Sequence, residues 1–158
     1  MLRRAEAADL PRIHALIRDF PQQLLDRGEG FLATLAADEE SRLMVWDRGG
    51  SGGGFAGFAM VEGMYPGVVN LSNLAVTAPG RGEGHAMILA VQDMVFAEMA
   101  MHRIFLDVAT DNAAGLRAFE AAGFVREGTM RECWLRPDGI WTDCHAFSML
   151  RREWEMRR

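Results

Sequence analysis

The chain has 158 residues, of which 49% are apolar and 25% charged, so it is long enough to bury a core without disulfide or metal staples. Its formal net charge of −5 gives no electrostatic support for binding nucleic acid or a membrane surface. The opening MLRRAEAADL lacks the apolar segment of a secretory signal, and no apolar run is long enough to span a bilayer. We therefore expect one cytoplasmic domain over residues 1–158.

The first predicted elements are a short strand over residues 2–6 and two helices. Asp9 is expected to cap the first helix, in which apolar residues recur at helical spacing: Leu10, Ile13, Leu16, Ile17 and Phe20. A weaker helix covers residues 30–37. Residues 43–46 and 55–61 then form two paired strands, joined by DRGGSGGG. We interpret that segment as a flexible, solvated loop rather than a phosphate site, because no helix follows it.

In the middle of the chain, the sequence predicts a strand, a helix and a second strand. Residues 68–76 form the first strand, and residues 104–108 form the second. The helix between them runs from about His85 to Met99 and is apolar on most sides, so we expect it to be well buried.

A further helix follows, capped by Asp111 or Asn112. Its apolar residues lie on or near one side: Leu116, Phe119 and Ala122. Gly123 is typical of a left-handed helix end, and Phe124 is the apolar contact expected after it.

Two long strands, over residues 124–135 and 140–150, form a terminal hairpin. Pro137 has no N–H for a two-residue hairpin turn. We therefore place Pro137 and Asp138 at the centre of a type I turn, with Gly139 in the left-handed position after it.

That register directs Cys133 and Cys144 to opposite faces, so we expect two free thiols. Neither cysteine has an adjacent base that would favour an acetyl-enzyme, and the histidines show no metal spacing. The element order β-α-α-β-β-β-α-β-α-β-β predicts an α/β (α+β) fold. About four helices flank a mixed, mostly antiparallel sheet of about seven strands.

The segment APGRGEGHA, residues 78–86, places glycines where a strand meets a helix. The free N–H groups and the dipole of a helix start favour a phosphate. The chain contains no lysine, which excludes a P-loop, and no register of these glycines fits the dinucleotide fingerprint GxGxxG.

The run Arg81-Gly82-Glu83-Gly84-His85-Ala86 resembles the pyrophosphate-binding signature of the GNAT acetyltransferase superfamily. The element order also matches that family along nearly the whole chain. Further motifs stand where the family shows its own: Leu74-Ala75-Val76 with Pro79, Asp111-Asn112, Phe119 and Ala122-Gly123-Phe124. The terminal hairpin is similar to that of the ribosomal-protein-alanine acetyltransferase branch.

The resemblance implies the GNAT fold with a splayed sheet centre, acetyl-CoA as donor and no metal. An amine acceptor would attack the thioester directly, through a tetrahedral intermediate. A backbone N–H near Ala75 would polarise the thioester carbonyl. The implied cofactor-binding residues are Leu74, Ala75 and Val76 for the pantetheine arm, Arg81, Gly82, Glu83, Gly84, His85 and Ala86 for the pyrophosphate, and Asn112 and Phe119 further along.

The acceptor amine must lose a proton to attack, and a carboxylate can take it. Asp107 is our first candidate base, because it is charged within an otherwise apolar strand. It can equally be a solvated side chain or a helix-capping partner. Glu62 is the second candidate and Glu132 the third.

The resemblance also implies a proton donor for the departing sulfur, and here the sequence departs from the family. Phe119 stands in place of the usual tyrosine, and Gly115 in place of the serine of the ribosomal branch. Three explanations stay open. CoA leaves as a thiolate, Tyr65 or His145 supplies the proton, or the domain binds CoA with little turnover.

The sequence leaves the acceptor open between a small-molecule amine, including an aminoglycoside-like antibiotic, and a protein N-terminus. Trp134 and Trp141 can line its site or simply pack on the sheet. A homodimer is compatible with the family. The alternative functions are a CoA-binding regulatory or sensor domain, and a structural domain with no CoA affinity.

Overall fold

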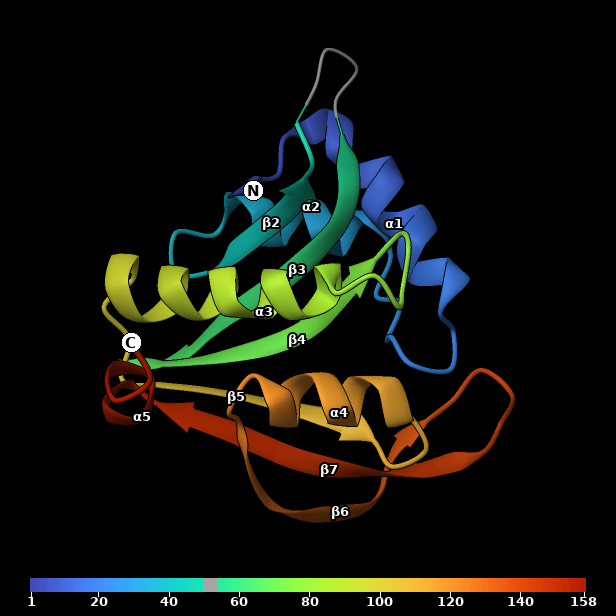
Figure 1. Cartoon of the computed structure of the whole chain (residues 1–158). Coiled ribbons are helices and arrows are strands. Elements are labelled where there is room, and N and C mark those ends of the chain that lie inside the picture. Colours follow the sequence, from blue (N-terminus) through green and yellow to red (C-terminus); the bar gives the residue numbers. More distant parts are fainter. Residues whose placement is uncertain (50–53) are drawn as a thin grey trace.

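The computed structural model describes residues 1–49 and 54–158. The predicted DRGGSGGG loop therefore lies partly outside the described residues. Seven strands of the described chain join one sheet in the order β1-β2-β3-β4-β5-β7-β6 (Figure 1). They are β1 (Leu2–Arg4), β2 (Arg42–Asp47), β3 (Phe55–Tyr65), β4 (Val68–Val76), β5 (Arg103–Ala109), β6 (Val125–Leu135) and β7 (Trp141–Leu150). Only the β4–β5 pair is parallel, which confirms the mixed, mostly antiparallel sheet.

The helices pack on both faces of this sheet. They are α1 (Leu10–Asp19), α2 (Glu29–Ala37), α3 (Glu83–Asp93), α4 (Ala113–Ala121) and α5 (Arg151–Glu155). The last is a short helix that the sequence did not predict. A π-helical turn over Met94–Glu98 continues α3, so the predicted helix to Met99 is confirmed in extent but not in uniform geometry.

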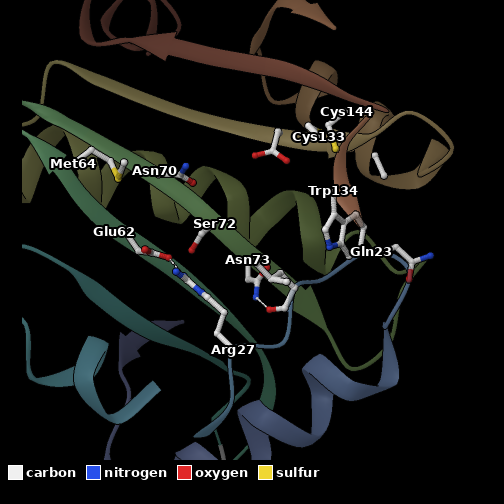
Figure 2. Close-up of a pocket in the computed structure, with 13 residues that line it drawn as sticks. Gln23, Arg27, Glu62, Met64, Asn70, Ser72, Asn73, Cys133, Trp134 and Cys144 are labelled. Carbon is white, nitrogen blue, oxygen red and sulfur yellow. Dashed lines mark hydrogen bonds and ion pairs between the residues drawn. The ribbon is translucent and has the colours of Figure 1, made fainter. Parts of the chain in front are cut away.

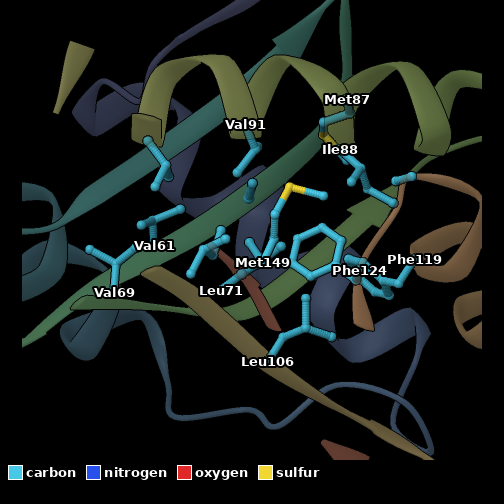
Figure 3. Packing of buried hydrophobic residues seen from close by; sticks show 14 of the residues in the cluster. Val61, Val69, Leu71, Met87, Ile88, Val91, Leu106, Phe119, Phe124 and Met149 are labelled. Atoms are coloured by element: carbon cyan, nitrogen blue, oxygen red, sulfur yellow. The ribbon is translucent and has the colours of Figure 1, made fainter. Parts of the chain in front are cut away.

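Each face of the sheet carries its own hydrophobic core. Along β3, Phe58 and Met60 pack in the cluster of α1 and α2, whereas Ala59 and Val61 pack in the cluster of α3 and α4. This alternation follows the two-residue period of a strand. Figure 3 shows α3 facing the strands through Met87, Ile88 and Val91. The start of α3 is thereby held at the end of β4.

Two predicted caps have different outcomes. Asp9 precedes α1 as expected, but a 3₁₀ turn over Ala7–Asp9 gives it helical dihedral angles. Its carboxylate therefore points back, accepting from the Glu6 N–H at 2.8 Å and from Arg3 at 2.7 Å, and it does not cap the helix. At α4 the cap is Asn112 rather than Asp111, because Asn112 Oδ1 accepts from the Gly115 N–H at 3.0 Å.

The predicted hairpin turn is confirmed. The Gly139 N–H donates to the Arg136 carbonyl at 2.9 Å, and Gly139 has φ 84°. Pro137 and Asp138 therefore occupy the central positions of the turn. The left-handed φ at the third position is the one that glycine adopts without strain.

The prediction that the two cysteines face opposite sides is wrong. A bulge interrupts β6 between Met130 and Trp134, and Glu132 within it has φ 45°. The Glu132 N–H donates to Asp143 Oδ1 at 2.7 Å, which fixes the bulge. Because a bulge shifts the alternation of side chains, Cys133 and Cys144 line the same cavity. Both are free, as expected.

Candidate active site

The sheet opens between β4 and β5. These strands pair only where Val68–Asn70 lies beside Arg103–Phe105, although both continue well beyond those residues. A narrow channel of about 50 Å³ follows the divergence, bounded by Leu74 of β4, Asp107 of β5 and Phe119 of α4. The sequence resemblance implied this splayed centre, and the structure contains it.

The antiparallel β3–β4 ladder decides which backbone groups of β4 face the opening. The Thr77 N–H donates to the Ala56 carbonyl of the β3 side at 2.8 Å. Because alternate residues of a strand direct their N–H groups to the same neighbour, Ala75 also faces β3. Leu74 and Val76 direct theirs toward the opening. The Ala75 N–H itself therefore does not face the opening, whereas those of its two neighbours do.

The start of α3 presents a set of free backbone donors. Gly82 is the N-cap residue with φ 79°, a left-handed conformation that favours glycine. The N–H groups of Glu83, Gly84 and His85 occupy the first turn, where a helix offers no internal acceptor. The Ala86 N–H donates to the Gly82 carbonyl at 3.1 Å, so unlike the three before it this donor has an acceptor within the helix.

Two charged side chains flank this helix start. The Glu83 carboxylate accepts from Arg48 Nε at 2.6 Å and from Nη2 at 2.5 Å, and this pair lowers the pKa of Glu83. Glu83 therefore offers an anion its N–H only. The Arg81 side chain is exposed beside the free N–H groups. Neutralised Glu83, exposed Arg81 and the helix dipole together favour an anionic ligand.

A larger cavity of about 370 Å³ adjoins the channel (Figure 2). Asp107, Ser72, Asn73 and Gln23 line both spaces, so the channel and the cavity lie side by side. The residues lining the cavity are Gln23, Leu25, Arg27, Glu62, Met64, Asn70, Ser72, Asn73, Asp107, Ala109, Cys133, Trp134 and Cys144.

Asp107 holds the central position in this opening. Asp107 is solvent-exposed in β5 and lines both the channel and the cavity. Burial raises the pKa of Asp107, and a weaker interaction with the Cys144 thiol lowers it. Burial also raises the pKa of the Cys144 thiol far above its usual range, with further contributions from Cys133 and Asp107. A base is thus available, whereas a nucleophilic thiolate is disfavoured.

Glu62 lies in the same cavity but is already paired. Its carboxylate forms an ion pair with Arg27, and the Arg27 guanidinium also lies 3.5 Å from the centre of the Phe31 ring. Glu62 does not line the channel, whereas Asp107 does. Of the two predicted bases in the cavity, Asp107 is better placed to receive a proton.

Three other predicted side chains do not line the cavity or the channel. Glu132 sits in the exposed bulge of β6. Tyr65 is 70% exposed at the end of β3. His145 pairs with the Thr129 hydroxyl through Nδ1 at 2.8 Å. Of the two tryptophans considered for the acceptor, Trp134 lines the cavity and Trp141 does not.

The two departures from the family pattern have a packing basis. The Phe119 ring packs edge-on against Phe124, with 5.5 Å between ring centres, and carries no proton to donate. A Cβ added to Gly115 would lie 2.7 Å from Asn112 Nδ2. A serine at this position therefore conflicts with the Asn112 cap as it stands.

Sequence reasoning missed several cavity residues. Ser72 lines both the channel and the cavity, and its hydroxyl lies 3.5 Å from the Met60 carbonyl of β3. Asn73 Nδ2 donates to the Leu25 carbonyl at 3.0 Å, which anchors the segment before α2 to β4. Asn70 Oδ1 is buried without a partner among the described residues. The polar residues inside the apolar run VVNLSNLAV were the available signal.

The chain belongs to the acetyltransferase (GNAT) family, whose model matches residues 10–124. It is 36% identical over 85 residues to the SPbeta prophage-derived uncharacterized N-acetyltransferase YokL of Bacillus subtilis, a match that covers 52% of this chain and 48% of that protein. It is 32% identical over 71 residues to the probable N-acetyltransferase YjcK of the same organism, covering 45% and 39%. The chain thus spans about half or less of the curated relatives it matches.

The fold is similar to that of solved spermidine N-acetyltransferases from Vibrio cholerae. A SpeG mutant superposes with a TM-score of 0.84 at 22% identity, covering 99% of this chain and 98% of that one. A dodecameric structure of that enzyme gives a TM-score of 0.82 at 22% identity, covering 99% and 96%. At this level of identity the likeness concerns the fold. In the described part of the chain, no helix is long and apolar enough to cross a membrane.

Proposed function

We propose that the chain is an N-acetyltransferase that moves an acetyl group from acetyl-CoA to a primary amine by direct attack. The observation that carries this proposal is the combination of three features in one fold. These are free N–H groups at the start of α3, unpaired edges of β4 and β5, and a cavity that holds Asp107.

The residues present fit acetyl-CoA. The N–H groups of Gly82, Glu83, Gly84 and His85 suit a pyrophosphate, and no atom lies within 4 Å of a Cβ placed on Gly84, so the approach is open. Leu74 and Val76 offer backbone groups to the amides of the pantetheine arm, as an added strand does. Asn112 and Phe119 line the channel beside it. The bound group supplies an activated acetyl thioester.

The chain's own residues then have two tasks: they remove a proton from the acceptor amine, and they orient the thioester for attack. Asp107 takes a proton from the acceptor ammonium, directly or through water, and its raised pKa suits that task. We propose the Leu74 N–H, which does not face β3, as the donor that polarises the thioester carbonyl. Ser72, which lines both spaces, is the new candidate to hydrogen-bond the departing sulfur. A thiol is already a fair leaving group.

The experiment is an amine panel with release of free CoA as readout, run beside a melting-shift assay. We expect CoA release with at least one amine, and stabilisation by acetyl-CoA. Gly84→Trp should remove both, because the indole fills the space before the free N–H groups. Gly128→Trp is the matched control, since Gly128 also has open space around a Cβ but lies on exposed β6. Stabilisation without release would favour the sensor function instead.

We further propose that the described elements form one domain, since all seven strands join one sheet.

We also propose that the chain self-associates. The strand β6 is an exposed sheet edge that carries apolar Val125 and Met130. Light scattering of the purified chain would show a mass of two or more copies.

The resemblance to the ribosomal-protein-alanine acetyltransferase branch favours a peptide amino terminus as acceptor, whereas the solved relatives are described as spermidine enzymes.

A further inference from the structure

A second cavity continues the acceptor site. It has a volume of about 300 Å³ and lies between the segment that precedes α2 and the β6–β7 turn. Leu25 and Trp134 line both this cavity and the first one, so the two share a wall; Figure 2 shows Trp134 in the lining of the first cavity. Apart from Arg18 and Asp26, its lining is apolar: Ile17, Pro21, Leu24, Leu25, Trp134, Leu135 and Pro137.

This wall exposes apolar side chains that an apolar ligand could cover. Leu25 is 50% exposed and Leu135 is 48% exposed, so both would gain burial if a ligand covered them. The Arg136 guanidinium lies 5.4 Å from the centre of the Trp134 ring. Arg136 is itself held by Asp111, at 2.8 and 2.5 Å. This contact restrains the Trp134 ring, whose indole N–H is buried without a partner among the described residues.

The charged residues that line the two cavities can pair with one ammonium group of a ligand. In the first cavity, Glu62 is neutralised by Arg27, which leaves Asp107 as the unpaired carboxylate among the described lining residues. Arg18 and Asp26 both line the second cavity, so its lining carries no net formal charge, and Asp26 Oδ1 lies 3.0 Å from His14 Nε2. A second ammonium would thus enter a largely apolar space whose lining carries no net negative charge, and its desolvation there costs free energy.

We propose that the acceptor is a monoamine with an apolar arm, whose amine meets Asp107 and whose arm lies past Trp134 in the second cavity. This inference rests on the proposed function and separates this chain from enzymes that act on polyamines. The amine and the arm occupy different cavities, so each can be varied alone.

The experiment compares two acceptors of equal length, hexylamine and 1,6-diaminohexane, together with spermidine. They differ in the second amine. We expect kcat/KM, measured by CoA release, to be at least about ten-fold higher for hexylamine, because the arm of the diamine brings an unpaired charge. Leu135→Glu places a carboxylate in the second cavity and should reduce or invert that ratio. Ile140→Glu is the control, since Ile140 is 59% exposed on the same hairpin and lines neither cavity.

The outcomes are distinguishable. Equal or better turnover of 1,6-diaminohexane or spermidine by the unmodified chain would overturn this inference and leave the proposed function standing. An identical ratio in Leu135→Glu and Ile140→Glu would overturn the role of the second cavity. No CoA release with any amine would overturn the proposed function and this inference with it.

Discussion

At the scale of single residues, we expect Asp107 to raise the rate of acetyl transfer and to lower the stability of the fold. We predict that Asp107→Asn lowers kcat by about 10²- to 10⁴-fold, the usual contribution of a general base. The pH profile of kcat/KM in the unmodified chain should fall on the acid side, through the raised pKa of Asp107, because protonation removes the base. Glu62→Gln should keep that acid limb. If Glu62→Gln loses it and Asp107→Asn keeps it, Glu62 is the base.

Asp107→Asn, which should lower activity, should increase the stability of the fold. The folded-state pKa of Asp107 lies above its unfolded value, so the folded chain binds more protons between the two values. Stability is therefore lost as pH rises through that window. At neutral pH, Asp107→Asn should melt at a higher temperature than the unmodified chain, and the gain should shrink below about pH 4. A lower melting temperature at neutral pH would contradict the desolvation cost.

The two thiols should differ sharply in reactivity. In denaturant without reductant, a thiol reagent should count two free thiols. In the folded chain, exposed Cys133 should react faster than buried Cys144 by on the order of ten-fold or more, because burial raises the pKa of Cys144. Modification of Cys133 should block the acceptor cavity and reduce activity. Cys133→Ser should be insensitive to the reagent; equal sensitivity would place Cys133 outside the site.

At the scale of elements, the loop before α3 depends on one left-handed glycine. Gly82→Ala should destabilise the chain by about 1–2 kcal/mol, since φ 79° strains any residue with a Cβ. Gly84→Ala, two residues on, has helical geometry and open space, so it should stabilise by about 0.5 kcal/mol. Denaturant unfolding measures both. Equal effects of the two substitutions would show that backbone conformation at Gly82 is not the determinant.

Local signals in the sequence predicted the elements well. The left-handed Gly123 after α4, the Pro137-Asp138-Gly139 turn and the strand bounds of β4 each follow from the residues themselves. The Glu132 bulge did not, because its bond to Asp143 joins residues on two strands. The Arg27–Glu62 pair was also hidden, since 35 positions separate its members. Asp107 stood out as a charge in an apolar strand, but only the fold shows what it faces.

At the scale of the whole molecule, one ion pair connects the middle of the sheet with its edge. Arg103 of β5 donates to Glu127 of β6 at 2.7 and 2.8 Å, and Ser148 of the intervening β7 donates to the same carboxylate at 2.5 Å. These contacts lower the pKa of Glu127 to about 2. The pair thus fastens the terminal hairpin, which carries Trp134 and both cysteines, to the strand that carries Asp107.

The folded-state pKa of Glu127 lies below its unfolded value, so the pair stabilises the fold above about pH 4.5 and that stability is lost as pH falls toward about 2. We predict that Glu127→Gln lowers the melting temperature at neutral pH and flattens its decline in acid. Glu120→Gln is the control, because its pair with Arg126 is exposed on both sides and joins only α4 to the start of β6. Thermal melting from pH 7 to pH 3 measures the difference. Parallel curves for Glu127→Gln and the unmodified chain would show that the ion pair does not hold the hairpin in place.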